Sequence, residues 1–180
     1  MSNKINKKFT VGSLFAGIGG IDLGFQQAGF DIKWANEIDK NACKTYKKNF
    51  THNLIEEDIH NLSPRKIPKV DVITSGFPCQ PFSLAGYRKG FKDDRGNLFF
   101  ETLRFIQTIK PKAFFLENVK NLYGHDKGNT FKVIRKSLID SGYSFLTKII
   151  NTKDYSNIPQ TRERIYIVGF RGESEFNKLN

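Results

Sequence analysis

A strand, a glycine-rich turn and a short helix open the chain, and this order limits what it can fold into. Residues 10–15 form a short apolar strand, three glycines lie between positions 17 and 20, and residues 21–28 carry apolar side chains at helical spacing. This is the opening of a doubly wound α/β domain, where glycines let backbone N–H groups approach a ligand at a helix N-terminus. It is not the G-x-G-x-x-G fingerprint of dinucleotide-binding proteins, because the sixth residue counted from Gly17 is Asp22.

The rest of the chain continues with alternating strands and helices. We therefore expect an α/β fold, with a doubly wound, mostly parallel sheet and helices on both faces. No linker or repeat interrupts the 180 residues, so residues 1–180 are predicted to form a single domain with a core at about 10–171 and polar termini. The predicted strands lie near 32–35, 53–57, 70–75, 113–116, 144–151 and 165–170, and the predicted helices near 40–49, 99–109 and 131–141.

The composition favours a nucleic-acid partner. Lys and Arg number 29 against 18 Asp and Glu, and a net charge of +11 fits a polyanion. The polar N-terminus and the lack of an apolar run of about 20 residues predict a cytoplasmic protein without a membrane contact. The thiols of Cys43 and Cys79 are then expected to be free, and no metal site is predicted. Cys43 falls at helical spacing with Tyr46 and Phe50, which indicates packing.

Two acidic residues follow predicted strands near the glycine turn. Glu37 ends the second strand, 20 positions after Gly17, and Asp58 follows the third. A carboxylate at the first position can accept hydrogen bonds from ribose hydroxyls, and one at the second suits the amino group of an adenine. Because the carboxyl ends of adjacent parallel strands meet at one crevice, these loops are predicted to converge. For Glu37 the alternative is a charge that stabilises the N-terminus of the next helix.

Cys79 lies between Pro78 and Pro81 at the end of the apolar strand 70–75. The two prolines stiffen this turn and hold the thiol in one direction. An isolated free cysteine is more often a small buried hydrophobe, and that alternative applies here. The segment 84–96 that follows is basic and rich in glycine, which favours a lid over a phosphate backbone rather than a solvated surface loop.

Four motifs now stand in order along the chain. They resemble those of the C5-cytosine DNA methyltransferases, in particular the bacterial restriction–modification type, and the resemblance runs from about Thr10 to Phe170. The first is similar to the family's methyl-donor turn, the second to its catalytic loop, and the last two to its base-binding elements. The motifs are Phe15–Gly20, Pro78–Gln80, Glu117–Val119 and Gln160–Arg164.

The resemblance implies methyl transfer from S-adenosylmethionine to C5 of a cytosine flipped out of double-stranded DNA, with S-adenosylhomocysteine as product. Cys79 would add to C6 of the ring, which makes C5 nucleophilic. Glu117 would hydrogen-bond or protonate N3, and Arg164 would contact O2 with support from Arg162. Either arginine can instead be an ion-pair partner of Glu117.

The resemblance also implies the remaining site residues. Ile38 stands where the family often has a tryptophan that stacks on the adenine, so weaker donor binding is expected. The donor would be held by Phe15, Ala16, Gly17, Gly19, Gly20, Glu37, Ile38, Asp58, Ile59, Pro78 and Leu98. The DNA would be held by Gln80, Ser83, Arg88, Lys89, Asn118 and Val119.

Bacterial members of the family continue well beyond this sequence. They add a target-recognition domain and a final helix that completes the donor pocket, and neither is expected here. The chain is therefore predicted to be a catalytic core with weak or no activity alone, or one that needs a second polypeptide for recognition.

Three alternatives stay open. The first is a cytosine-C5 methyltransferase acting on tRNA, although Phe77 and the pair Phe82 and Ser83 favour the DNA branch. The second is an inactive subunit or remnant that binds the donor or nucleic acid. The third, an NAD-dependent oxidoreductase, is disfavoured by the glycine spacing.

Overall fold

The computed structural model describes residues 8–78 and 98–172, which contain a seven-stranded sheet in the order β3-β2-β1-β4-β5-β7-β6. The first five strands in this order are parallel, and β7 runs antiparallel to both of its neighbours. The mostly parallel α/β sheet predicted from the sequence is confirmed. The strands are β1 (Thr10–Leu14), β2 (Asp31–Asn36), β3 (Asn53–Ile55), β4 (Val72–Ser75), β5 (Ala113–Val119), β6 (Tyr143–Asn151) and β7 (Glu163–Arg171).

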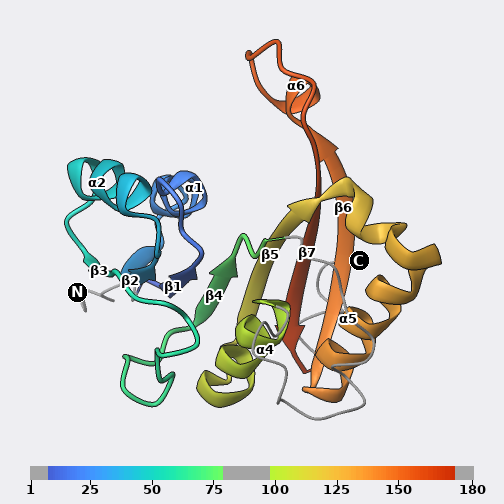
Figure 1. The fold of residues 1–180 in the computed structure, drawn as a ribbon, viewed down its shortest axis with the longest axis horizontal. Coiled ribbons are helices and arrows are strands. Elements are labelled where there is room, and N and C mark those ends of the chain that lie inside the picture. Colours follow the sequence, from blue (N-terminus) through green and yellow to red (C-terminus); the bar gives the residue numbers. More distant parts are fainter. Residues whose placement is uncertain (1–7, 79–97, 173–180) are drawn as a thin grey trace, which may run out of the picture.

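Helices follow most of the strands and cover the sheet on both faces (Figure 1). Two short 3-10 helices, η1 (Lys120–Tyr123) and η2 (His125–Gly128), follow β5 and were not predicted. None of the helices in the described ranges is long and apolar enough to cross a membrane. The α-helices are α1 (Gly20–Gln27), α2 (Lys40–Asn49), α4 (Leu98–Ile109), α5 (Asn129–Asp140) and α6 (Thr152–Tyr155).

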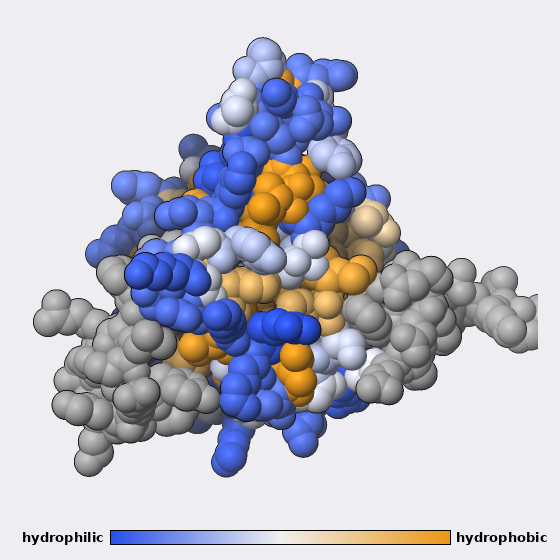
Figure 2. Space-filling model, turned by 90° about the vertical axis from the view of Figure 1, so that its right-hand side faces the viewer, coloured by the Kyte–Doolittle hydropathy of each residue, from blue (hydrophilic) through white to orange (hydrophobic). Residues whose placement is uncertain are grey.

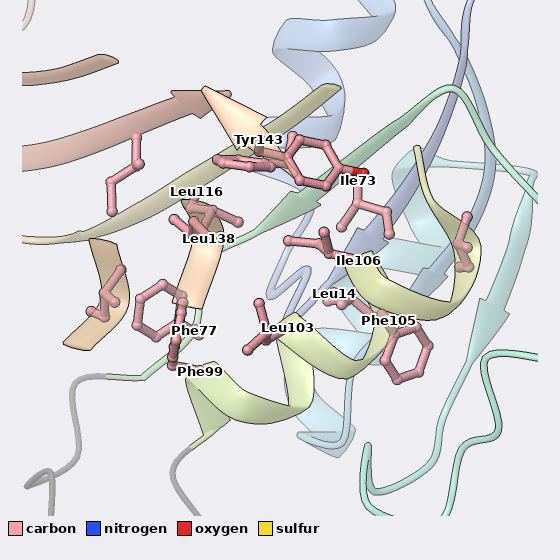
Figure 3. Packing of buried hydrophobic residues seen from close by; sticks show 14 of the residues in the cluster. Leu14, Ile73, Phe77, Phe99, Leu103, Phe105, Ile106, Leu116, Leu138 and Tyr143 are labelled. Carbon is pink, nitrogen blue, oxygen red and sulfur yellow. The ribbon is translucent and has the colours of Figure 1, made fainter. Parts of the chain in front are cut away.

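The main core lies between the sheet and the helices α4 and α5. Alternate residues of β5 are buried, as expected for a strand with one face on this core. Leu14, Ile73 and Leu116 project from three neighbouring strands toward Phe105 and other apolar side chains of α4 and α5 (Figure 3). This packing fixes the carboxyl ends of β1, β4 and β5 beside one another.

The opposite face of the sheet is covered by α1 and α2. Val11 and Val72 pack with Phe25 of α1, and Ala35 packs with Tyr46 and Phe50 at the level of α2. Cys43 is 1% exposed on the same helix, which confirms its predicted packing role. The two helices thus hold the glycine turn and the end of β2 on the same side of the sheet.

Helix boundaries follow local chemistry. The side chain of Asp39 caps α2 by accepting hydrogen bonds from the backbone N–H groups of Asn41 and Ala42 at 3.0 and 2.7 Å. Gly29 after α1 and Gly142 after α5 have φ angles of 88° and 85°, which side chains rarely tolerate. These signals are local, so the sequence could predict where the helices end.

Strands β6 and β7 extend past the carboxyl edge of the parallel strands and carry α6 at their tip (Figure 1). Asn151 stabilises the tip by accepting a hydrogen bond from the backbone N–H of Arg162 at 3.1 Å. At the edge of the sheet Leu146 and Ile149 are 44% and 42% exposed. Figure 2 shows apolar side chains among hydrophilic ones on this side of the molecule. Edge strands are usually protected by charge, and Lys148 lies between these two residues.

Gly169 of β7 lies directly on an aromatic ring. A Cβ atom at this position would lie 2.2 Å from the Phe114 ring, which is fully buried. We predict that Gly169→Ala lowers the free energy of unfolding by about 2 kcal/mol or more, measured by urea denaturation. Gly24→Ala is the matched control, because nothing lies within 4 Å of the added carbon. It should stabilise α1 by about 0.5–1 kcal/mol, and equal losses in the two variants would contradict the packing argument.

Asp71 joins the amino ends of β1, β4 and β5. Its carboxylate accepts hydrogen bonds from the backbone N–H and the hydroxyl of Thr10 at 3.0 and 2.9 Å and pairs with Lys112 at 2.9 Å. The Thr10 backbone N–H, supported by Lys112 and the Thr10 hydroxyl, lowers the pKa of Asp71 from 3.8 to about 2. The ionised carboxylate therefore stabilises the folded state.

Acid should remove this stabilisation. Because the pKa is lowered on folding, the contribution is complete above about pH 4 and is lost as the pH falls toward about 2. We expect a loss of about 1–2 kcal/mol, since the exposed Lys112 is screened by solvent. Urea denaturation at pH values across this range measures it. Asp71→Asn should show the lower stability already at neutral pH and a shallower pH dependence, and an unchanged pH dependence would contradict the assignment.

Candidate functional site

The glycine turn after β1 is held in an unusual backbone conformation. Phe15, Gly17 and Gly19 have φ angles of 53°, 56° and 93°. A positive φ strains a bulky residue such as Phe15, and such strain is retained where the surrounding structure requires it. The backbone N–H of Ala16 donates to the carbonyl of Asn36 at 3.0 Å, so the turn is attached to the end of β2.

Glu37 makes the second attachment. Its carboxylate accepts hydrogen bonds from the backbone N–H groups of Gly17 at 2.7 Å and of Ile38 and Asp39 at 2.8 Å each. The two carboxylate oxygens therefore contact the backbone of the glycine turn and of the start of α2, and the predicted contact of Glu37 with the ribose stays a prediction. The half-buried carboxylate lies next to the turn, where its remaining lone pairs can accept from a ligand hydroxyl.

A second acid lies at the end of β5. Glu117 is paired with Arg164 at 2.9 Å and lies 3.7 Å from Arg162, both from the β7 side of the sheet. The side chain of Glu117 is 19% exposed. Tyr166 lies opposite Glu117 in the antiparallel register, and burial together with the charge of Glu117 raises the pKa of its hydroxyl. The alternative in which the arginines pair with Glu117 is the one present in this structure.

Asn118 holds the start of the loop that leads to Cys79. Its side chain donates to the carbonyl of Phe77 at 2.8 Å and accepts from the backbone N–H of Val119 at 2.8 Å. Phe77 is 2% exposed and packs against Phe99 with ring centroids 5.6 Å apart, while Pro78 is exposed. Asn118 is itself 3% exposed and contacts the loop backbone in this structure, and its contact with DNA stays a prediction.

A cavity of about 770 Å³ lies where these elements meet. It brings together three residues predicted for the donor, Phe15, Ala16 and Gly20, and two predicted for the base, Glu117 and Arg162. Its size lies within the range of about 300–1,000 Å³ that is common for small-molecule sites. The remaining residues that line it are Ile18, Ile21, Gly24, Phe25, Ala28, Phe30, Gly76, Phe115 and Tyr166.

Eight other predicted donor residues do not line this cavity, and four of them, Gly17, Gly19, Glu37 and Pro78, lie in the loops described above. Ile38 is 61% exposed beside Glu37, and Leu98 begins α4 and packs against the main core. Asp58 accepts hydrogen bonds from the backbone N–H and the ring of His60 at 2.9 and 2.7 Å, and these bonds lower its pKa. Ile59 is 3% exposed and packs in the main core, and its contact with the donor stays a prediction.

The catalytic loop itself lies outside the residues that the structure describes. The predictions for this segment rest on the sequence resemblance alone. They concern Cys79, Gln80, Ser83, Arg88 and Lys89. What the structure places is the preceding residue, Pro78, at the carboxyl edge of β4.

Comparison with known proteins identifies the family of this chain. A family model for the C-5 cytosine-specific DNA methylases matches residues 9–180. The chain belongs to this family. The family predicted from the order of the motifs is thereby confirmed, and the matched region covers nearly all of the sequence.

Curated methylase relatives are similar over half of their length. The Type II methyltransferase M.Bsp6I of Bacillus sp. (strain RFL6) is 58% identical over 172 residues, which cover 94% of this chain and 55% of that protein. The Type II methyltransferase M.NlaX of Neisseria lactamica is 50% identical over 164 residues, which cover 90% of this chain and 52% of that protein. The chain thus spans about half the length of the curated relatives it matches.

Solved structures share the fold. A putative DNA modification methyltransferase encoded within an E. coli prophage superposes with a TM-score of 0.76 at 28% identity, over 93% of this chain and 48% of that one. The S. pombe Dnmt2 methyltransferase superposes with a TM-score of 0.74 at 26% identity, over 91% of this chain and 51% of that one. Both comparisons support the overall fold described above.

Sequence reasoning did not assign nine of the residues that line the cavity, and two of these nine, Gly76 and Tyr166, lie beside Glu117. Gly76 lies near Glu117, since a Cβ atom on it would be 3.7 Å from Oε2 of that carboxylate. Tyr166 shares a face of β7 with Arg164, two positions earlier, and this alternation was the available signal. The alternation could not show that Tyr166 lies opposite Glu117, because the pairing of β7 with β5 is set by the fold.

The three backbone contacts of Glu37 lead to a stability prediction. We expect Glu37→Gln to lower the free energy of unfolding by about 1 kcal/mol, because a neutral amide is a weaker acceptor and one of its ends cannot accept at all. Urea denaturation measures this loss. Glu57→Gln is the control, since its exposed carboxylate has no hydrogen bond among residues 8–78 and 98–172. A similar loss in both variants would mean that the bonds to the turn contribute little.

Proposed function

We propose that the chain is the catalytic core of a DNA cytosine-5-methyltransferase that uses S-adenosylmethionine. The observation that carries the proposal is the single cavity shared by the glycine turn and Glu117 with Arg162. Methyl transfer requires the donor and the pyrimidine to lie next to each other, and this cavity borders residues proposed for both. The family membership and the basic charge of +11 support DNA as the substrate.

The glycine turn fits the donor. A Cβ atom on Gly17 or Gly20 would meet nothing within 4 Å, so a ligand can approach the backbone closely there. The N-terminus of α1 begins at Gly20, and Glu37 can accept from the ribose hydroxyls while it holds the turn. Bound S-adenosylmethionine supplies the methyl group and leaves as S-adenosylhomocysteine. Asp58 and the exposed Ile38 would contact the adenine end.

The chemistry on the base is assigned to Cys79 and Glu117. The Cys79 thiolate forms a bond to C6 of the cytosine, and the electrons of the C5=C6 double bond move to C5, which becomes nucleophilic. Glu117 donates a hydrogen bond or proton to N3, which takes up the negative charge that develops in the ring. After C5 is methylated, loss of the C5 proton and expulsion of the Cys79 thiolate restore the double bond.

Positioning residues surround this pair. Asn118 fixes the carbonyl of Phe77, two residues before Cys79, and so directs the start of the catalytic loop. Arg164 is assigned to O2 of the base and Arg162 to a supporting role. Gln80, Ser83, Arg88 and Lys89 are assigned to the DNA on the basis of the resemblance.

Target recognition is assigned to protein beyond this sequence. The relatives that match are about twice as long as the matched region, so a recognition domain on a second polypeptide or a longer chain would complete the enzyme. The isolated chain is expected to have weak or no methylation activity.

Covalent trapping tests the proposal. The chain is mixed with S-adenosylmethionine, a duplex DNA pool containing 5-fluorocytosine, and the separately produced second half of the Bacillus relative that is 58% identical. The fluorine cannot leave as a proton would, so a working thiolate stays attached to the base. We expect mass spectrometry to show that Cys79 gains the mass of one DNA strand. This increase should occur only when S-adenosylmethionine is present.

Three comparisons make the result specific. Cys79→Ser should form no adduct, and Cys43→Ser should form as much as the parent chain. Replacing the DNA with tRNA that contains 5-fluorocytosine should abolish trapping, while trapping only on this tRNA would favour the tRNA methyltransferase alternative. Absence of an adduct in the reconstituted mixture would contradict the proposed enzyme.

A further inference from the structure

A buried chain of polar side chains lies beneath the glycine turn. Asp22, in the first turn of α1, is fully buried, and the hydroxyl of Tyr46 from α2 donates to its Oδ2 at 2.5 Å. Nε2 of His52 contacts the same hydroxyl. With Asp22 ionised, the single phenolic hydrogen is given to the carboxylate, so Nε2 of His52 must carry the hydrogen that bonds the phenolic oxygen. The three groups form one continuous hydrogen-bonded chain.

This buried group of hydrogen-bonded side chains is costly in free energy. Burial raises the pKa of Asp22 and of Tyr46 and lowers that of His52, so the site opposes every charge placed in it. Oδ1 of Asp22 is buried and forms no hydrogen bond of ordinary geometry in the part of the chain that the structure describes, although Ser13 lies close enough to lower the pKa of the carboxylate. Apolar side chains of similar size often stabilise such a position better than a buried carboxylate. Stability alone is therefore a poor explanation for this group of residues.

The geometry points to an effect on the turn. Gly19 packs directly against two aromatic rings. A Cβ atom on Gly19 would be 2.2 Å from the ring of Phe50 and 3.0 Å from the ring of Tyr46. The rings of Tyr46 and Phe50 are 4.6 Å apart, and that of His52 lies 5.3 Å from Phe50. The N-cap of α1 is Gly19, and no side chain caps this helix. The bond from Tyr46 to Asp22 joins the first turn of α1 to α2.

The turn is thus held against α2 at both ends. Gly17 donates to Glu37 just before α2, and Asp22 accepts from Tyr46 in the middle of that helix. The two bonds fix the backbone between residues 17 and 22 relative to the carboxylate assigned to the ribose. A shift of about 1 Å in such a site can reduce function by as much as about 100-fold.

We propose that Asp22 and Tyr46 are positioning residues for the methyl donor, and that their hydrogen bond sets the glycine turn at the distance from Glu37 that the donor needs. The inference rests on the proposed function of the turn. Neither residue lines the cavity, so both would act through the backbone of residues 17–22.

The experiment compares two tyrosine variants of the full chain. Tyr46→Phe removes the bond to Asp22, and Tyr143→Phe removes a matched buried bond, from its hydroxyl to the carbonyl of Pro111 at 2.7 Å, far from the turn in the sequence and at the amino end of β5. Binding of S-adenosylhomocysteine is measured by titration calorimetry and NMR. Amide hydrogen exchange of residues 17–23 and the melting temperature are measured on the same samples.

The two substitutions should lower the melting temperature by similar amounts but differ in their effects on ligand binding and on the glycine turn. We expect Tyr46→Phe to bind the product analogue about tenfold more weakly and to exchange the amides of residues 17–23 faster, since a hydrogen bond to a charged group is lost. Tyr143→Phe should match the parent chain in both. Equal binding in the two variants, or unchanged exchange in the turn of Tyr46→Phe, would overturn the inference.

A second variant covers the case in which Tyr46→Phe does not fold. Asp22→Asn keeps an oxygen that can accept from Tyr46, so its binding should stay within about threefold of the parent chain, whereas Asp22→Leu should bind about tenfold more weakly. Equal binding by the Asn and Leu variants would refute the positioning role. A parent chain that binds no donor or product would instead refute the proposed function, which separates the two failures.

Discussion

A single carboxylate determines how the proposed donor side of this site is assembled. Glu37 accepts hydrogen bonds from the glycine turn and from the start of α2, so the two loops that follow the paired strands β1 and β2 are tied to one side chain. An ionised acceptor with several N–H donors is stronger than a neutral one, and it holds the turn without filling the space beside it. The backbone of Gly17 can then face a ligand, because nothing lies within 4 Å on its open side.

The other half of the site depends on the sheet. In the parallel part, the ends of β1, β2 and β4 bring backbone groups to one edge, and the antiparallel strand β7 adds the side chains that face Glu117. Arg164 pairs in register with Val119, and Tyr166 with Glu117 itself, so the arginine reaches the acid diagonally across the strand pair. Because β7 runs antiparallel to β5, its first residues lie beside the last residues of β5, and this places Arg164 and the preceding Arg162 next to Glu117.

The parts of the site that the sequence predicted are those with local causes. The glycine turn is recognisable because its residues must adopt positive φ, and α2 (Lys40–Asn49) because Asp39 caps it. Tyr166 was missed since its position beside the acid depends on the β5–β7 register. The bond from Asn118 to the carbonyl of Phe77 was also not predicted, because a motif shows which residue matters but not which way its side chain points. That direction depends on burial, which is a property of the whole fold.

In the proposed function, the ion pair at Glu117 is exchanged when a base binds. Breaking a half-buried pair by removing one partner leaves a charge without compensation, which is strongly unfavourable. A cytosine would offer both replacements on one edge, since its O2 accepts from a guanidinium while its N3 and N4 amino group face a carboxyl. Glu117 and Arg164 would then separate and each gain a bond to the same ring, so the ion pair keeps both groups compensated until the base replaces it.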